Sequence, residues 1–227
     1  MRRDDLLTFL VAEIVGRKEQ SRPLKVGFDG RCASGKSALA NELALALRPS
    51  RWTVVRPSVD GFHQPRERRY QKGEYSAIGY YEDAYDYQTV IDCLLGLLSG
   101  AVFPVLCRQA AHDVRTNMPV AAPPISVSCD SVLLFEGLFL FRRELNAYWD
   151  FRILLDIDPA TSLSRAIERD TIDPADIVRR KYEQRYEPAW QIYVNHEHPE
   201  FKADVIVDNC DFLQPQLLKP AGSRGRR

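Results

Sequence analysis

The segment GRCASGKS at residues 30–37 constrains this chain more than any other feature. It matches the pattern G-x-x-x-x-G-K-[ST] at every fixed position. A short apolar run at residues 24–29 precedes it, and a stretch rich in alanine and leucine follows at residues 36–47, as in a strand–loop–helix unit. Glycines let such a loop turn successive N–H groups toward phosphate oxygens, beside the positive end of the helix. The sequence therefore predicts a nucleoside triphosphate site.

We assign the whole phosphate loop, defined as residues 30–37, and the residue after it to nucleotide binding. Lys36 places a positive charge near the β- and γ-phosphates, and Ser37 offers a hydroxyl to Mg²⁺. A chance glycine turn before a helix is the alternative, and it leaves the agreement of both flanks unexplained. The predicted nucleotide-binding residues are Gly30, Arg31, Cys32, Ala33, Ser34, Gly35, Lys36, Ser37 and Ala38.

Strands and helices alternate along the rest of the chain. Several apolar runs are nearly continuous, which is typical of strands covered on both faces. Predicted strands lie at residues 24–29, 52–59, 131–135, 151–157 and 203–207, and predicted helices at the amphipathic N-terminus and at residues 36–47, 88–99, 159–170 and 174–195. The order predicts an α/β P-loop NTPase fold, with a mainly parallel, doubly wound sheet flanked by helices.

One domain accounts for most of the 227 residues. A chain of this length can bury a sufficient core without disulfides. We expect a single domain over residues 1–213 that includes a lid at about residues 165–185. Prolines and short apolar runs at residues 101–128 indicate a small β-hairpin insertion. Residues 214–227 are rich in Pro, Gly and Arg and predict a disordered basic tail.

Composition excludes several classes of partner. The chain has 31 basic and 31 acidic residues, and proteins that bind nucleic acid usually carry a basic excess. The longest apolar stretch, residues 132–141, is too short to span a bilayer and contains Glu136. Five widely spaced cysteines without a CxxC pair fit a reducing, cytoplasmic setting better than disulfides or zinc. A homo-oligomer is compatible with the sequence, which leaves the oligomeric state open.

Two acidic residues follow predicted strands, where ligands bind in open α/β sheets. Asp60 could accept the proton of a substrate hydroxyl or organise magnesium. Glu136 could hold magnesium directly or through water. For each, the alternative is a solvated acid in a loop. Together with Ser37, these two carboxylates form the predicted metal site.

Five segments together resemble the uridine kinase and phosphoribulokinase family of P-loop kinases. The first is the phosphate loop with its flanks. The others are SVDGFH at residues 58–63, LLFEGLFLF at 133–141, LSRAIERD at 163–170 and HPEFKADVIVDN at 198–209. The loop, the DGFH segment and the LSRAIERD segment are jointly specific, and the similarity spans about residues 24–210.

This resemblance implies a phosphotransferase that uses Mg²⁺ and either ATP or GTP as phosphoryl donor. The γ-phosphoryl group would pass to a primary hydroxyl, which in uridine kinases is the 5′-hydroxyl of uridine or cytidine. The resemblance makes Asp60 the catalytic base and places Glu136 near magnesium. It also places Arg165 and Arg169 on the phosphates, with Ala166 where many members have another arginine. Lys36 completes the predicted catalytic set.

The acceptor region departs from the uridine kinase pattern. That pattern, P-[IV]-Y-D-x…H-x-R, has a Tyr and a His that contact the base, but here Leu106 replaces the Tyr, Cys107 replaces the Asp and the His is offset by one residue. The usual N-F-D-x-P segment is replaced by GYYEDAYD at residues 79–86. We still expect a nucleoside acceptor, in a pocket formed by His63, Tyr81, Asp83, His112 and Arg115.

Two alternatives stay open at this stage. One is a kinase of another alcohol, such as pantothenate, a sugar phosphate or glycerate. The other is a P-loop regulatory module that binds nucleotide without phosphorylating a metabolite. Against the second, the chain has no guanine-reading N-K-x-D stretch, and it carries Asp60, Arg165 and Arg169, which a transferase needs more than a switch does.

Overall fold

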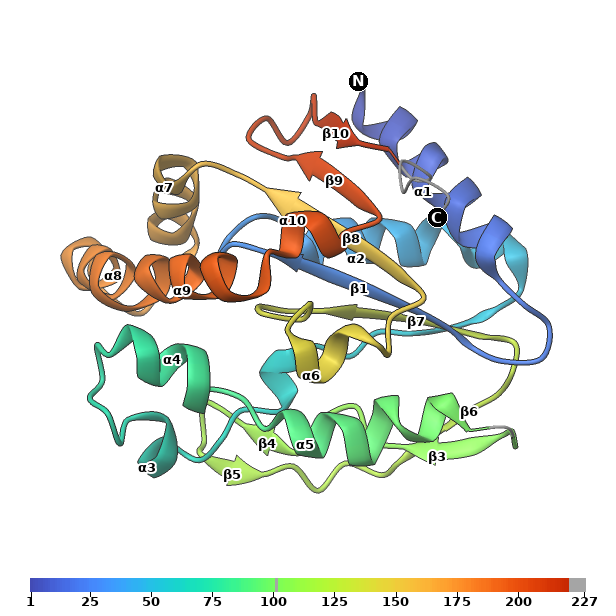
Figure 1. Cartoon of the computed structure of the whole chain (residues 1–227), viewed down its shortest axis with the longest axis horizontal. Helices are drawn as coiled ribbons and strands as arrows, with labels where there is room; N and C mark the ends of the chain where they lie inside the picture. Colours follow the sequence, from blue (N-terminus) through green and yellow to red (C-terminus); the bar gives the residue numbers. More distant parts are fainter. Residues whose placement is uncertain (101, 221–227) are drawn as a thin grey trace.

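The computed structural model describes residues 1–100 and 102–220 and is built on a six-stranded sheet (Figure 1). The strand order is β10-β9-β8-β1-β7-β2. All adjacent pairs are parallel except β10 with β9. The predicted parallel sheet is therefore confirmed. Its strands are β1 (Leu24–Gly30), β2 (Thr53–Val55), β7 (Ser131–Glu136), β8 (Phe151–Asp156), β9 (Val205–Asp208) and β10 (Gln216–Lys219).

Helices cover both faces of the sheet and extend past its carboxyl end. α7 agrees with the helix predicted at residues 159–170. Pro159 begins this helix, and Asp158 caps it by accepting the Thr161 N–H at 2.8 Å. The π-helical segment Tyr182–Tyr186 joins α8 to α9, and Ile91–Leu95 continues α5. The α-helices are α1 (Arg3–Arg17), α2 (Lys36–Ala46), α3 (Arg66–Arg69), α4 (Ala77–Asp83), α5 (Tyr87–Val90), α6 (Arg143–Asn146), α7 (Pro159–Arg169), α8 (Ala175–Lys181), α9 (Glu187–Glu197) and α10 (Pro199–Lys202).

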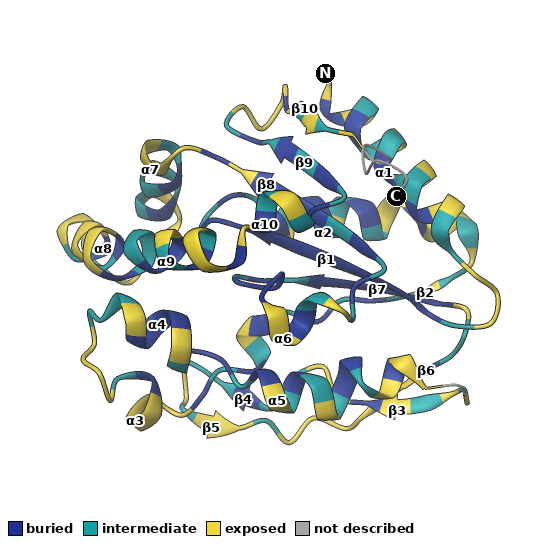
Figure 2. Ribbon diagram, in the orientation of Figure 1, coloured by how far each residue is buried: buried dark blue, intermediate teal, exposed yellow. Residues whose placement is uncertain are grey.

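Side chains alternate between two cores along the central strands, because successive residues of a strand point to opposite faces. On β7, Val132 and Leu134 pack with α1 and α2, whereas Leu133 and Phe135 pack with α4, α5 and α9. Figure 2 shows β1 and β7 buried while α7 and α8 carry exposed residues. No helix in the described part of the chain is both long and apolar enough to cross a bilayer.

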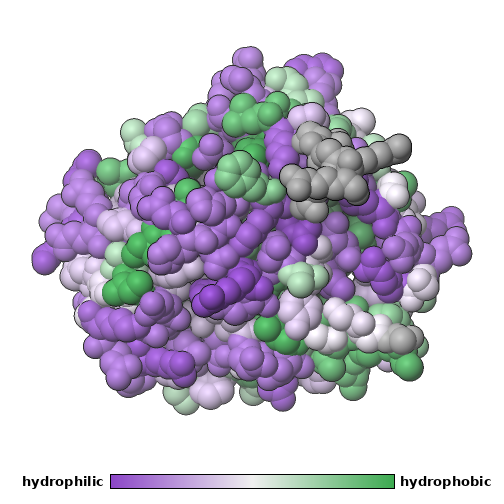
Figure 3. Space-filling view, viewed as in Figure 1, coloured by the Kyte–Doolittle hydropathy of each residue, from purple (hydrophilic) through white to green (hydrophobic). Residues whose placement is uncertain are grey.

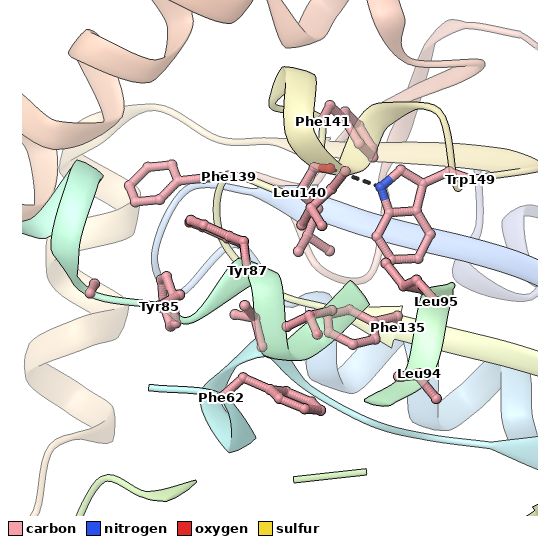
Figure 4. Close-up of a cluster of buried hydrophobic side chains, with 14 of the residues drawn as sticks. Phe62, Tyr85, Tyr87, Leu94, Leu95, Phe135, Phe139, Leu140, Phe141 and Trp149 are labelled. Atoms are coloured by element: carbon pink, nitrogen blue, oxygen red, sulfur yellow. Dashed lines mark hydrogen bonds between the residues drawn. The ribbon is translucent and has the colours of Figure 1, made fainter. Parts of the chain in front are cut away.

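The core on the side of the sheet that faces α4, α5 and α9 is rich in aromatic residues (Figure 4). Phe135 lies between Phe62 and Trp149, with ring centroids 6.3 and 5.4 Å away. The Trp149 indole N–H donates to the Leu140 carbonyl at 2.8 Å, so its polar edge is satisfied inside the core. This packing fixes the turn that precedes Phe62 against the end of β7, and both lead into the cavity described below.

The predicted insertion consists of two small antiparallel pairs. β3 (Val105–Cys107) pairs with β6 (Ile125–Val127), and β4 (His112–Asp113) pairs with β5 (Met118–Pro119). Its outer side is apolar, since Val102 and Leu106 are largely exposed. Figure 3 shows hydrophobic side chains gathered over this end of the molecule, on an otherwise mostly hydrophilic face.

Three boundary predictions are wrong. The strand expected at residues 52–59 ends at Val55, because Pro57 lacks the N–H that a ladder needs. The sequence pattern Asp173-Pro174 predicts that Asp173 caps a helix whose first residue is Pro174, but α8 begins at Ala175 and Asp173 pairs with Lys181. The tail expected to be disordered from residue 214 contains β10, which adds to the sheet edge. Residues 221–227 of that predicted tail lie outside the described part.

A fully buried carboxylate, Asp29, links the phosphate loop to the segment after β7. Its Oδ1 accepts the N–H groups of Gly30 at 2.7 Å and Phe139 at 3.1 Å. Its Oδ2 accepts the Phe141 N–H at 3.1 Å and the Tyr193 hydroxyl at 2.5 Å. Burial raises the pKa of Asp29, and these donors oppose that rise. Phe139 has a φ of 63°, which a bulky residue adopts only when its surroundings hold it.

We expect Asp29→Asn to lower the free energy of unfolding by about 1–3 kcal/mol, because one carboxylate oxygen becomes an NH₂ that faces two donors. Urea unfolding followed by circular dichroism measures the change. Asp92→Asn is the matched control, since Asp92 is exposed and an amide can still accept from Gln88. An unfolding free energy for Asp29→Asn equal to that of the control would contradict this account of the buried carboxylate.

Candidate active site

A cavity of about 810 Å³ opens at the carboxyl end of the sheet. Parallel strands direct their carboxyl ends to one edge, so the loops after β1, β2 and β7 meet there. Residues of α7, of α8 and of the π-helical segment Tyr182–Tyr186 line a second side of the cavity, and residues at α3 and α4 line a third. The phosphate loop, Asp60, Glu136, Arg165 and Arg169 all line it. Residues that the sequence places far apart therefore share one solvent-filled space.

The phosphate loop depends on two glycines. Gly35 has a φ of 92°, and a Cβ there would lie 2.6 Å from the Asn209 amide nitrogen. At Gly30, with a φ of 150°, a Cβ would lie 2.3 Å from the Leu155 carbonyl oxygen. The Asn209 amide in turn donates to the Ser34 carbonyl at 2.7 Å. A side chain at either glycine would therefore displace the loop that holds the phosphates.

Lys36 is folded over the same loop. Its ammonium group donates to the carbonyl oxygens of Gly30 and Arg31, each at 2.8 Å, and only 7% of the residue is exposed. These carbonyl partners are neutral. Among the described residues, no carboxylate lies within ion-pair distance of the Lys36 ammonium group. The charge can therefore attract an anion in the cavity.

A hydroxyl and a carboxylate meet where magnesium is expected. Ser37, in the first turn of α2, donates to Glu136 Oε1 at the end of β7 at 3.0 Å. Both are hard oxygen ligands, and Mg²⁺ is commonly held by one or two such groups together with substrate phosphates. In the part of the chain that the structure describes, no group of three or more His, Cys, Asp or Glu is placed to hold a metal. Ser37 and Glu136 fit a Mg²⁺ that shares its coordination with the nucleotide.

Asp60 lies on a short 3₁₀ turn, Val59–Gly61, and its side chain is exposed to the cavity. Ser58 caps the turn by accepting the Asp60 N–H at 3.2 Å. The Tyr85 hydroxyl donates to Asp60 Oδ1 at 3.4 Å, and burial holds the pKa of Tyr85 well above its usual range, so the hydroxyl stays protonated. The other carboxylate oxygen is left free to accept a proton.

Two arginines reach the cavity from α7. Arg165 donates to the Cys210 carbonyl at 2.8 Å, and Arg169 lies 3.8 Å from the Cys32 sulfur. The base of the helix is fixed to the phosphate loop, since the Ser162 hydroxyl donates to the Cys32 carbonyl and accepts from Tyr182. The predicted pair of phosphate-facing arginines is therefore close to the loop.

Of the five acceptor residues predicted from the sequence, one lines the cavity and four do not. His63 lines the cavity; burial lowers its pKa, which Asp60 partly opposes. Tyr81, Asp83, His112 and Arg115 do not line it. Tyr81 packs edge-on against Phe139 in the core, and Asp83 pairs with Lys72 at 2.7 Å. His112 is buried beside Asn117, and Arg115 is exposed to solvent elsewhere.

The cavity contains residues that the sequence prediction missed. Tyr85 and Tyr186 lie outside any motif that the sequence shows. Arg69, Tyr70 and Tyr80 belong to a run of arginines and tyrosines that the sequence leaves open between an acceptor-binding loop and a solvated charged loop. Arg185 belongs to the predicted basic face of the lid helix, where pairing with nearby glutamates is the alternative. The pairing of α4 with α9 could not be read from spacing alone. The cavity residues absent from the predicted site include Arg69, Tyr70, Tyr80, Tyr85, Arg185 and Tyr186.

Comparisons with known proteins agree with this geometry. The sequence profile of the Phosphoribulokinase / Uridine kinase family matches residues 26–212. Uridine-cytidine kinase B of Dictyostelium discoideum is 26% identical over 82% of this chain and 74% of its own length. A pantothenate kinase of Streptococcus agalactiae is 25% identical over 69% of this chain and 52% of its own, so the chain spans about half of that relative.

A solved structure gives the same result. The structure of a possible uridine kinase from Bacillus stearothermophilus superposes with a TM-score of 0.67 at 26% identity. The match covers 89% of this chain and 97% of the other. The profile match covers most of the chain, including the phosphate loop and α7. The chain belongs to the Phosphoribulokinase / Uridine kinase family, whose members are small-molecule kinases.

Proposed function

We propose that this protein transfers the γ-phosphoryl group of ATP to a hydroxyl of a small molecule, with Asp60 as the base. The observation that carries the proposal is the exposure of Asp60 to the same cavity as Lys36, Ser37 and Glu136. GTP is the alternative donor. The acceptor oxygen attacks the γ-phosphorus as Asp60 takes its proton, the bond to the β–γ bridging oxygen breaks, and ADP leaves.

Charge neutralisation and positioning account for most of the catalysis, since the transition state of phosphoryl transfer is loose. Lys36 faces the phosphate chain from the loop, and Arg165 and Arg169 face it from α7. Bound Mg²⁺ would neutralise further charge on the β- and γ-phosphates. Tyr85 and His63 orient the Asp60 side chain and backbone, through contacts of 3.4 and 2.9 Å.

Residues 165–185 would act as a lid. Support comes from the exposed outer surfaces of α7 and α8 and from the small apolar cluster of Ala166, Val178 and Tyr182 beneath them. A lid over the nucleotide would exclude water and suppress hydrolysis of ATP. The contact of Ser162 with the phosphate loop gives this segment a fixed base from which to close.

Two classes of acceptor are candidates. A nucleoside, acting through its 5′-hydroxyl, is supported by the similarity to uridine-cytidine kinases. Against it, Leu106 is 64% exposed and Cys107 is buried in the insertion, and neither lines the cavity. An anionic alcohol such as pantothenate, glycerate or a sugar phosphate is the second class, and it is favoured by two buried arginines, Arg69 and Arg185, in the cavity wall.

We further propose that the enzyme works in the cytoplasm without a nucleic-acid or membrane partner. Its five cysteines are all free, which suits a reducing compartment. Its formal net charge is zero, so the positive charge that matters is confined to the cavity rather than spread over the surface.

We expect Asp60→Asn to lower kcat by about 10²-fold or more while the Kd for MgATP changes by less than about twofold, because the amide cannot accept the hydroxyl proton. Release of ADP and formation of a phosphorylated acceptor are measured with labelled ATP, Mg²⁺ and a panel of nucleosides, sugar phosphates and hydroxy acids. Asp4→Asn, an exposed position on α1, is the control. Full activity of Asp60→Asn would refute the base assignment, and hydrolysis without transfer to any alcohol would refute the kinase proposal.

We expect Lys36→Ala to weaken MgATP binding by about tenfold or more, because a charge-assisted contact to phosphate is lost. Titration calorimetry measures this Kd directly. Lys72→Ala is the matched control, since Lys72 pairs with Asp83 at 2.7 Å and lies outside both the cavity lining and the proposed lid. Equal affinities in the two variants would mean that Lys36 serves only to brace the loop through Gly30 and Arg31.

A further inference from the structure

Five arginines are buried in the described part of the chain, and they fall into two groups. Arg3, Arg31 and Arg142 each have a carboxylate partner, at 2.8, 3.2 and 2.9 Å. Arg69 and Arg185 have none within 4 Å among the described residues, although they are only 6% and 4% exposed. Both of these two line the cavity. A buried cation without a counter-ion is costly unless a ligand supplies one.

The hydrogen bonds of these two side chains leave most of their donors unused. Arg69 Nε donates to the Gln64 carbonyl at 2.8 Å, and Arg185 Nη1 donates to the Glu74 carbonyl. Arg185 Nε is buried and has no hydrogen-bond partner. Since a guanidinium group has five N–H donors, each side chain can still bind a planar or tetrahedral anion at two points.

Aromatic packing holds the two guanidinium groups in place. Their Cζ atoms lie 5.2 and 4.9 Å from the centroid of the Tyr70 ring, and Arg185 also lies 4.8 Å from the Tyr80 ring. Both arginines therefore meet at one tyrosine, although they come from α3 and from the segment between α8 and α9. Contacts with aromatic faces pre-order the side chains, so less freedom is lost when an anion binds.

The position of the pair relative to Asp60 indicates which substrate it serves. The Tyr80 hydroxyl lies 3.3 Å from the Tyr85 hydroxyl, which donates to Asp60. Arg69 Nε donates to the carbonyl of Gln64, the residue after His63, and the His63 ring lies 4.6 Å from the Tyr85 ring. The two arginines thus lie on the Asp60 side of the cavity. The donor phosphates have their own cations in Lys36, Arg165 and Arg169.

We infer that Arg69 and Arg185 bind an anionic group of the acceptor, so that the substrate is an anionic alcohol with its reactive hydroxyl at Asp60. This inference rests on the proposed kinase function. Both a phosphate and a carboxylate carry the negative charge and the acceptor oxygens that the two guanidinium groups can bind. A neutral nucleoside would leave both buried charges without a counter-ion. The two arginines would therefore select the acceptor class as well as orient it.

Matched pairs of alcohols test this inference. Ribose 5-phosphate is compared with ribose, glycerate with glycerol, and pantothenate with pantothenol, and uridine is included as a neutral nucleoside. Binding is measured by calorimetry with Mg²⁺ and a non-hydrolysable ATP analogue, and turnover by ADP release with ATP. We expect the charged member of at least one pair to bind about tenfold or more tightly than its neutral partner. The phosphate and carboxylate arms distinguish the two anions.

Variants of the two arginines identify the residues responsible. Arg69→Gln and Arg185→Gln should each lower kcat/KM for that acceptor by about tenfold or more, mainly through its KM, with the KM for ATP changed by less than about twofold. Arg66→Gln on α3 and Arg48→Gln between α2 and β2 are exposed controls outside the cavity lining and should keep wild-type values. Arg185→Lys keeps the charge, so it should retain part of the preference if charge rather than packing is responsible.

The outcomes separate the inference from the proposed function. Tighter binding of uridine or of every neutral partner would overturn the inference, and so would arginine variants that raise the KM for ATP instead of the acceptor. Binding of an anion that depends on Arg69 and Arg185, without any transfer, would support the anion site and refute the kinase function. Transfer to a neutral alcohol alone would support the kinase function and overturn the anion site.

Discussion

The buried Asp29 carboxylate is the interaction on which the geometry of the site depends. It joins the first residue of the phosphate loop to the segment after β7 and to Tyr193 on α9. The same segment follows Glu136, whose carboxylate accepts from the Ser37 hydroxyl. Because a buried carboxylate is stable only when its acceptor sites are filled, each of these donors is held in a fixed place. One buried carboxylate thus fixes the phosphate loop relative to the segment that follows Glu136.

Buried arginines outside the cavity have carboxylate partners, whereas the buried arginines and lysine in the cavity have none among the described residues. Outside the cavity, buried arginines are neutralised by carboxylates, as Arg142 is by Glu144. Inside it, Lys36, Arg69 and Arg185 contact neutral carbonyl groups or aromatic rings. A folded protein tolerates such unpaired charges where a ligand completes them, so their position marks the functional surface more sharply than the formal net charge of zero does.

Local patterns were sufficient for the fold and for the kinase family. The phosphate loop is a contiguous segment whose residues act through their own backbone, so its function can be read without tertiary information. Asp60 and Glu136 follow strands, and parallel strands bring such residues to one edge of the sheet. The predicted acceptor residues succeeded less well. On α4, Tyr81 packs into the core while Tyr80 faces the cavity, and adjacent residues of one type carry no signal of that choice.

The sequence by itself determined the P-loop fold, the phosphate loop and the position along the chain of Asp60 after β2 and of Glu136 at the end of β7, because each depends on local order. The tertiary structure determined which residues form the wall of the cavity on the Asp60 side. Arg69 and Arg185 are more than a hundred residues apart, and only the packing of α3, α4 and the segment before α9 brings both to Tyr70. Their lack of a carboxylate partner is likewise a property of the folded molecule. Charge pairing is a matter of distance in space, and no spacing in the sequence encodes it.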